Sequence, residues 1–348
     1  MTSSRVTMQS IARVAGVSVP TVSRVLNGRD GVSPSTRSRV EDLLREHGYR
    51  ARNSLRAGSS LALFDVIFPE IECAWETEHI RGIEEVARDA GVGIVVSSLS
   101  GGATATEQLL RRLRIGRTDG VILAANTGDE PMRSALSSLN IPVVALDPAI
   151  RVPGQVPTVD AANWAGAHAA TRHLLDLGHR RIATITGDPG LRCSQARFDG
   201  YRAALEEAGL VGAAGLSGGL VDGLAGGLVE CGDFLHRSGL DAGLRLLTRD
   251  HPPTAIFAAN DHMALGVYEA ARRLRVGIPE QLSVVGFDDL PGAGWASPPL
   301  TTVRQPLQDM GRSAAETLLT LARGETLDTP HVRMTTSLVV RESTQQVS

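Results

Sequence analysis

The residues best suited to chemistry lie in a short polar run near the N-terminus. Arg24 carries a planar guanidinium, which can donate two hydrogen bonds to the acceptors on a guanine edge. The side chains around it are short hydroxyls and amides, which suit phosphate oxygens and hold a protein in register on a duplex. These candidate phosphate contacts are Thr7, Ser18, Thr21, Ser23 and Asn27. The pattern indicates a surface that reads double-stranded DNA, with Val19, Pro20 and Arg24 at the base edges.

Two short helices are predicted to position these groups. Apolar residues recur at three- and four-residue spacings, which places them on one face of each helix. They are Ile11, Val14 and Ala15 in the first helix, and Val22, Val25 and Leu26 in the second. Thr7 and Ser18 are suitable N-caps, and Gly16 permits the positive φ that a tight turn between the helices needs. The pattern is typical of a helix-turn-helix, and an ordinary helical hairpin is the alternative.

A third helix and a local excess of positive charge follow. The helix is predicted to start after Ser33, with Pro34 at its first position and Gly48 at its end. Residues 1–58 hold ten arginines and four acidic residues, a net charge of +6, whereas the chain as a whole carries −3. The remaining residues therefore carry −9. This distribution is expected of a basic nucleic-acid reader joined to an acidic domain.

The rest of the chain alternates apolar runs with amphipathic stretches, the pattern of parallel strands joined by helices. Predicted strands are 61–68, 93–97, 120–124, 143–146, 181–186, 255–258 and 283–287. Predicted helices are 78–90, 162–177, 195–208 and 263–274. The glycine-rich stretch 209–232 is predicted to be a surface loop. We therefore expect an α/β fold, with ligands bound outside the carboxyl ends of the strands.

Ordered blocks along nearly the whole chain carry a known family pattern. In the N-terminal region they are Val14 to Gly28, Val32-Ser33-Pro34 and Gly48-Tyr49. Further along they are residues 177–182, 196–201, 257–266, 282–289 and 298–305. These blocks resemble the LacI/GalR family of bacterial repressors. The resemblance implies a three-helix helix-turn-helix headpiece and an effector core like the periplasmic binding proteins, with two doubly wound parallel-sheet subdomains.

The resemblance also implies domain limits. We expect a DNA-binding domain over residues 1–50, a hinge over 51–60, and an effector-binding and dimerisation domain over 61–348. In that last domain, one subdomain is expected from residues 61–160 with 303–328, and the other from 161–302 with 329–341. The family's tetramers carry a C-terminal leucine-repeat helix that this chain lacks, so a homodimer is expected.

Further DNA contacts follow from the resemblance. Ser33, Thr36 and Tyr49 are expected to contact DNA, and Leu55 is expected to wedge into the minor groove at the operator centre. The alternative for Leu55 is a linker leucine that packs on the effector domain. The stretch between Tyr49 and Leu55 is shorter than in the family, which leaves the DNA bend and the half-site spacing open.

Six residues are candidates for effector binding: Trp75, Asp160, Arg197, Phe234, Asn260 and Asp288. Arg197 matches a family arginine that contacts ligand, and Asp288 matches an acid that accepts ligand hydroxyls. Phe234 and Asn260 match further pocket positions, whereas the other two are chosen for their placement. Acids, amides and an arginine suit sugar hydroxyls, and an aromatic ring covers a sugar face. The alternative is that Arg197 and Asp288 pair with each other or cap helices.

We expect a cytoplasmic transcriptional repressor that binds a near-palindromic operator as a homodimer and responds to a small carbohydrate. Segments around residues 67–75 and 192–197 are similar to a family branch that includes actinobacterial regulators of plant-polysaccharide use, which implies a pentose or a glucose oligosaccharide. A purine or another metabolite as effector is the alternative. A sugar-binding protein without specific DNA binding is a second alternative.

Catalysis, metals, cofactors and membranes are not indicated by the sequence. Cys73, Cys193 and Cys231 are odd in number and widely spaced, which fits neither a disulfide framework nor a zinc site. The adjacent Asp288 and Asp289 are expected to point to opposite sides of a strand end, so they cannot flank one glycosidic bond. No run approaches the roughly 20 apolar residues of a membrane span. We therefore expect no enzyme activity, cofactor, metal site or membrane partner.

Overall fold

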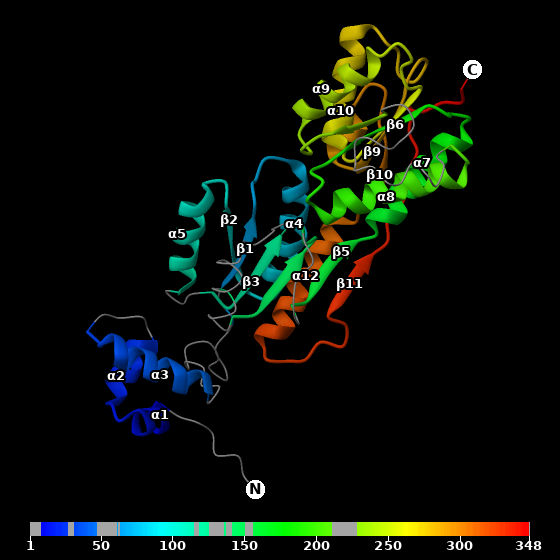
Figure 1. Ribbon diagram of the computed structural model, residues 1–348. Helices are drawn as coiled ribbons and strands as arrows, with labels where there is room; N and C mark the ends of the chain where they lie inside the picture. The colour runs from blue at the N-terminus through cyan, green and yellow to red at the C-terminus, as the bar shows by residue number, and fades with distance from the viewer. Residues whose placement is uncertain are drawn as a thin grey trace.

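The computed structural model describes residues 8–26, 31–46, 61, 63–114, 118–124, 136, 141–149, 156–210 and 228–347. Four predicted DNA contacts, Thr7, Asn27, Tyr49 and Leu55, lie outside these residues, as do the expected hinge and the helix end at Gly48. In Figure 1 the described chain begins with three helices and continues into two α/β subdomains. The predicted fold class is confirmed.

Three helices form the N-terminal unit: α1 (Met8–Ala15), α2 (Val19–Leu26) and α3 (Pro34–Glu46). Ser18 Oγ accepts a hydrogen bond from the backbone N of Thr21 at 3.3 Å, and Ser33 Oγ accepts one from the backbone N of Thr36 at 3.3 Å. Gly16 has a φ of +64°. The predicted caps at Ser18 and Ser33 and the predicted turn are therefore confirmed.

Among the predicted core residues whose burial the structure describes, Val14 differs from the prediction. Ile11, Ala12 and Ala15 of α1 are buried, whereas Val14 is 59% exposed. Successive residues turn by about 100° around a helix, so Ile11, Ala12 and Ala15 share one stripe and Val14 lies well to its side. The expectation that Val14 belongs to the core is wrong.

The first subdomain is built on a six-stranded parallel sheet with the order β11-β5-β4-β3-β1-β2. Its strands are β1 (Leu63–Phe68), β2 (Gly93–Ser98), β3 (Gly120–Ala124), β4 (Val143–Leu146), β5 (Thr158–Ala161) and β11 (His331–Met334). Its helices are α4 (Ala74–Asp89), α5 (Gly102–Arg114) and α12 (Leu307–Ala322). Helix α12 packs against α4 and against β3, β4 and β5, where Leu318 completes the core.

The second subdomain has the sheet order β12-β10-β9-β8-β6-β7, parallel except for β12. Its strands are β6 (Ile182–Thr186), β7 (Val229–Cys231), β8 (Ala255–Ala258), β9 (Ser283–Asp288), β10 (Thr301–Arg304) and β12 (Ser337–Val339). Its helices are α7 (Asn163–Asp176), α8 (Arg192–Glu207), α9 (His236–Leu247), α10 (Asp261–Leu274) and α11 (Pro291–Trp295). Strand β7 falls within the predicted loop 209–232, so that prediction is wrong for residues 229–231.

Among the elements that the structure describes, three connections run from one subdomain to the other. The first crossing joins β5 to α7, the second joins β10 to α12, and the third joins β11 to β12. Strand β11 pairs with β5 in the first sheet, with Val332 opposite Val159, so the assignment of residues 329–341 to the second subdomain is wrong for β11. The expected boundary between residues 302 and 303 falls inside β10, which pairs with β9 along its whole length.

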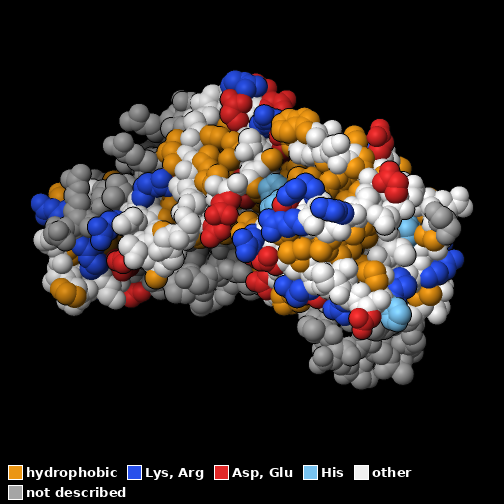
Figure 2. Space-filling model, turned by 90° about the horizontal axis from the view of Figure 1, so that it is seen from above, with side chains coloured by type: hydrophobic (Ala, Val, Ile, Leu, Met, Phe, Trp, Pro, Cys, Tyr) orange, Lys and Arg blue, Asp and Glu red, His pale blue; other side chains and the backbone are white. Residues whose placement is uncertain are grey.

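On the face seen in Figure 2, basic and acidic side chains are interspersed, with apolar side chains between them. Many arginines of the two subdomains are paired with a nearby acid, as Arg273 is with Glu269 at 2.8 Å. Within the ranges that the structure describes, none of the helices is both long and apolar enough to cross a membrane.

Candidate functional site

Of the predicted base-reading and phosphate-binding residues that the structure describes, Ser18 precedes α2, Val19, Pro20 and Thr21 lie in its first turn, and Ser23 and Arg24 lie in its second half. Ser18, Pro20 and Arg24 are exposed, while Val19 and Thr21 are half-buried. Ser18 Oγ also lies 2.8 Å from Thr21 Oγ1, so the capping hydroxyls are held at the helix N-terminus. Backbone N–H groups and the helix dipole make such an N-terminus a favourable place for a phosphate.

The start of α3 repeats this arrangement. Ser33 Oγ donates to Thr36 Oγ1 at 2.8 Å, besides accepting from the Thr36 backbone. Ser33 is exposed and Thr36 is half-buried, and Ser23 on α2 is half-buried as well. The helices α2 and α3 thus both start at a residue whose hydroxyl caps the helix. Contact of these helix starts with a DNA backbone stays a prediction.

A buried ion pair marks the second candidate site, at the carboxyl ends of the strands of the second sheet. Arg197, from the first half of α8, and Asp288, the last residue of β9, are 3% and 4% exposed. An Nη of Arg197 lies 3.5 Å from Oδ1 of Asp288. The predicted alternative, that the two residues pair with each other, is therefore observed, and their contact with a ligand stays a prediction.

Arg197 is held from several directions. Its Nε donates to Oδ1 of Asn163 at 2.8 Å, and an Nη donates to the backbone oxygen of Ala259, which follows β8. Its guanidinium lies 3.8 Å from the ring centre of Phe287 and 5.7 Å from that of Phe234. A guanidinium over an aromatic face is attracted to the ring. Together with the two hydrogen bonds, these contacts hold the guanidinium of Arg197 in one orientation.

The surroundings of Asp288 shift the pKa of its carboxyl upward. Burial raises the pKa of Asp288 to about 7, against the opposing effects of Arg197 and of a hydrogen bond from Gln305. That bond joins Gln305 Nε2 to Asp288 Oδ1 at 2.6 Å. The charges of Asp147 and Glu76 raise the pKa of Asp288 further. Glu76 lies on α4, so the first subdomain faces Asp288 as well.

Phe234 and Asn260 form one supported unit. Asn260 caps α10 by accepting from the backbone N of Met263 at 2.9 Å, and its Nδ2 donates to the backbone oxygen of Phe234 at 2.8 Å. Phe234 has a φ of +69°, and a Cβ at Gly187 would overlap its ring. Asn260 thus holds the loop that places Phe234, a supporting role that the sequence prediction did not include.

Trp75 and Asp160 lie in the first subdomain, whereas the other four candidates lie in the second. Trp75 packs edge-on against Phe68, with ring centres 6.3 Å apart, and its ring centre is 4.2 Å from that of His79. Asp160 accepts two hydrogen bonds from Arg333, at 2.8 Å and 3.1 Å. The structure accounts for both residues through neighbours in their own subdomain.

Two residues next to the ion pair were missed by the sequence analysis. Asp147 follows β4 directly and is 8% exposed, and burial raises its pKa while Arg197 lowers it. Its place after a predicted strand is the signal that could have found it. Gln305, which is 3% exposed, ends the family-like block 298–305, and its Oε1 is buried without a hydrogen-bond partner.

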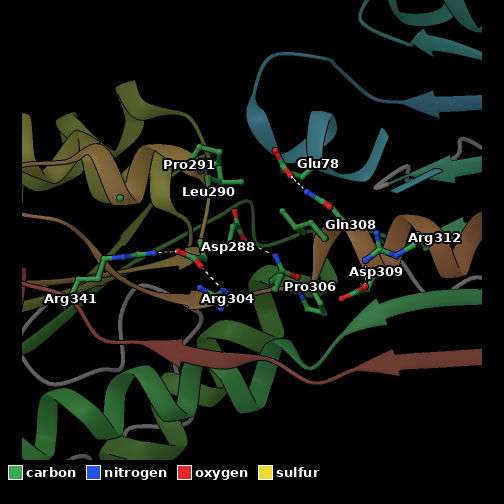
Figure 3. A pocket seen from close by; sticks show the side chains of 14 residues that line it. Glu78, Asp288, Leu290, Pro291, Arg304, Pro306, Gln308, Asp309, Arg312 and Arg341 are labelled. Carbon is green, nitrogen blue, oxygen red and sulfur yellow. Dashed lines mark hydrogen bonds and ion pairs between the residues drawn. The ribbon is translucent and has the colours of Figure 1, made fainter. Parts of the chain in front are cut away.

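A cavity of about 380 Å³ lies at the junction of the subdomains, and Asp288 and Gln305 form part of its wall. In Figure 3, Glu78 of α4 and Gln308 of α12 point toward each other on the side of the first subdomain, 2.6 Å apart. Of the six predicted effector residues, Asp288 alone lines this cavity.

Asp289 also lines the cavity and has partners of its own. It accepts hydrogen bonds from Arg304 at 2.6 Å and from Arg341 at 2.5 Å, whereas Asp288 binds Gln305 and Arg197. The two adjacent carboxyls therefore act separately, as their positions on a strand end predict. Among the residues that the structure describes, no three His, Cys, Asp or Glu side chains are grouped as a metal site would require.

Two family profiles match the chain. The profile of bacterial regulatory proteins of the lacI family matches residues 7–52, and that of a periplasmic binding protein-like domain matches residues 171–344. The ribose operon repressor of Escherichia coli (strain K12) is 32% identical over 341 residues, covering 97% of this chain and 99% of the repressor. The HTH-type transcriptional regulator CelR of Thermobifida fusca is 36% identical over 353 residues, covering 97% and 98%.

Solved structures agree with these relatives. A transcriptional regulator CelR–cellobiose complex has a TM-score of 0.72 at 33% identity, covering 97% of this chain and 100% of the other. The lac repressor dimer bound to operator and the anti-inducer ONPF has a TM-score of 0.69 at 27% identity, covering 98% and 100%. Both solved structures therefore match this chain over its helix-turn-helix unit and its two α/β subdomains. The chain is a member of the LacI family of bacterial transcription regulators.

Proposed function

We propose that this protein is a sequence-specific transcriptional repressor whose operator affinity is controlled by a small carbohydrate bound beside Arg197 and Asp288. The observation that carries this proposal is the buried, oriented Arg197–Asp288 pair at the carboxyl ends of the second sheet. Ligands of open α/β sheets bind at that edge. The helix-turn-helix on the same chain supplies the DNA-binding part.

The chemistry of the site suits a polyhydroxylated ligand. Asp288 can accept hydrogen bonds from hydroxyls, and Arg197 can donate to them. The unpartnered Oε1 of Gln305 offers a further acceptor. The ring of Phe234 supplies an apolar face of the kind on which a sugar ring packs. The cellobiose bound to CelR and the name of the ribose operon repressor support a carbohydrate over a purine.

The proposed mechanism is a shift between two states of a homodimer. Two copies of α2 would enter successive major grooves of a near-palindromic operator, with Arg24 of each on a base edge. A sugar that binds one arrangement of the subdomains more tightly changes the population of that arrangement, and operator affinity changes with it. We expect the sugar to induce, that is, to weaken operator binding, and to be released without chemical conversion.

Genomic fragments retained by the purified full-length protein at physiological salt would supply the operator. Fluorescence anisotropy with that operator then tests cellobiose, D-ribose and hypoxanthine as effectors. A sugar that weakens operator binding at least tenfold supports the proposal, and NMR of the recovered sugar should show it unchanged. A response to hypoxanthine alone would overturn the carbohydrate assignment, and retention of DNA without a shared motif would overturn the operator assignment.

A further inference from the structure

We propose that Asn163 and Gln305 are positioning residues that connect the Arg197–Asp288 pair to the chain crossings between the subdomains. Through them, a displacement within the pair is transmitted to the crossings. This proposal deepens the proposed function, because it rests on the pair as the place where the effector binds. The four residues Asn163, Arg197, Asp288 and Gln305 are called the relay below.

The relay starts in the first crossing. Asn163 is the first residue of α7 and follows the end of β5 by two positions. Its Oδ1 accepts from Arg197 Nε at 2.8 Å, and its Nδ2 donates to the backbone oxygen of Ala161 at 3.3 Å. One amide group therefore ties Arg197 to the last residue of β5. Asn163 is 7% exposed, so water does not readily replace these bonds.

The relay ends in the second crossing. Gln305 lies between the end of β10 and the start of α12. Its Nε2 donates to Asp288 Oδ1 at 2.6 Å, and the same Oδ1 is 3.5 Å from Arg197. The four side chains thus form an unbroken buried path from one crossing to the other. Asn163 and Gln305 communicate through Arg197 and Asp288.

The third crossing is joined to the first through the backbone. The N–H of Ala162 donates to the carbonyl oxygen of Met334 at 2.8 Å, and Thr336 Oγ1 donates to the carbonyl oxygen of Ala162 at 3.3 Å. A shift of residues 161–163 therefore reaches the end of β11. The relay and these backbone bonds together connect all three crossings.

A ligand would act on the relay by competition. A ligand hydroxyl that bonds to Asp288 or Arg197 displaces or reorients one of the buried side chains already bonded to that residue. A buried polar group that loses its partner is destabilised, so Gln305 or Asn163 must move to regain one. The Oε1 of Gln305 is buried without a hydrogen-bond partner, and the Nε2 of the same amide donates to Asp288. A hydroxyl bound to Oε1 would therefore displace the amide group that contacts Asp288.

Hydrogen exchange of the full-length protein without added ligand tests the relay. The variant Gln305→Met keeps the side-chain length and removes the donor. We expect it to speed exchange of the Ala162 amide by about tenfold, the usual effect of losing one buried hydrogen bond, although the two residues lie in different crossings. The control is Gln308→Met, because Gln308 Nε2 also donates to a carboxylate at 2.6 Å but lies outside the relay. That control should leave Ala162 unchanged.

Substitution of Asn163 tests transmission in the opposite direction, from the first crossing to the second. This test remains available if Gln305→Met does not fold. Asn163→Leu removes the acceptor for Arg197, and Asn163→Asp keeps one. We expect Asn163→Leu to speed exchange of the Leu307 amide, which donates to the carbonyl of Gln305 at 2.9 Å, and Asn163→Asp to keep it close to the wild-type rate. Equal effects of the two substitutions, or changes confined to the substituted crossing, would overturn the relay.

Calorimetry with cellobiose and with D-ribose on the same wild-type sample separates the two proposals. If neither sugar binds but exchange at Ala162 responds to Gln305→Met, the carbohydrate assignment fails and the relay stands. If a sugar binds but exchange at Ala162 responds to neither Gln305→Met nor its control, the relay fails and the carbohydrate assignment stands.

Discussion

The sharpest test of the buried pair is how the free energy of unfolding depends on pH in the Asp288→Asn variant and in the wild type. Burial raises the pKa of Asp288 to about 7 in the folded protein, from an ordinary value of 3.8. Between these values the folded protein holds a proton that the unfolded chain releases. The free energy of unfolding contributed by Asp288 is therefore greatest at low pH, falls as the pH rises toward 7, and is level above that.

The magnitude follows from the shift. Each pH unit between the two pKa values changes the unfolding free energy by about 1.4 kcal/mol. From pH 5 to pH 8 the Asp288 contribution should fall by about 3 kcal/mol, since two units of that interval lie below the raised pKa. Asn does not titrate. The variant should therefore gain about 3 kcal/mol relative to the wild type over this interval.

Urea unfolding followed by circular dichroism at pH 5, 6, 7 and 8 measures this difference. Asp199→Asn serves as a control for removing one acidic group, because the side chain of Asp199 is 50% exposed on α8. A difference between variant and wild type that stays constant from pH 5 to pH 8 would refute the reasoning. It would mean that Asp288 is an ordinary ionised partner of Arg197.

Two further substitutions test other parts of the structure. Arg24→Ala should weaken operator binding by about 1–3 kcal/mol and relax the sequence preference at one base position. Fluorescence anisotropy on operator variants measures this, with Arg13→Ala on the exposed surface of α1 as the control. An unchanged sequence preference would exclude Arg24 from base reading. Gly82→Ala should lower the unfolding free energy by about 1–3 kcal/mol, because a Cβ there would overlap the backbone oxygen of Gln308 where α4 meets α12. Gly294→Ala is the control in the same thermal or urea unfolding assay, because a Cβ at Gly294 would meet no neighbouring atom. Equal stability of the two variants would contradict the tight contact between α4 and α12.

Local signals in the sequence predicted local structure well. Ser18 and Ser33 cap the helices for which they were proposed, since capping depends on residues only three positions apart. The buried strands β3, β4 and β8 occupy the predicted ranges, because continuous apolar runs bounded by polar residues are typical of parallel strands. The Arg197–Asp288 pair was found through family-like blocks around each residue rather than through spacing.

Long-range pairing was harder to predict. The four residues of β11 include two exposed ones, His331 and Arg333, so nothing local assigns them to the first sheet rather than the second. Their partner strand is β5, far back in the chain. Asn260 was expected in the pocket, but its two hydrogen bonds go to α10 and to the Phe234 loop. A single sequence cannot show which of several partners an amide will use.

The three crossings between the subdomains affect how the first subdomain can fold during translation. Strand β5 is the edge of the first sheet until β11 is synthesised, because Thr158 and its neighbour His331 are 173 residues apart. Helix α12, which covers the core of that sheet, also arrives late. During translation the first subdomain thus has an open strand edge and an uncovered apolar face, both of which favour association with other unfinished chains. A fragment ending after β10 would stay in that condition permanently, so a nonsense mutation there should give insoluble product rather than a working half.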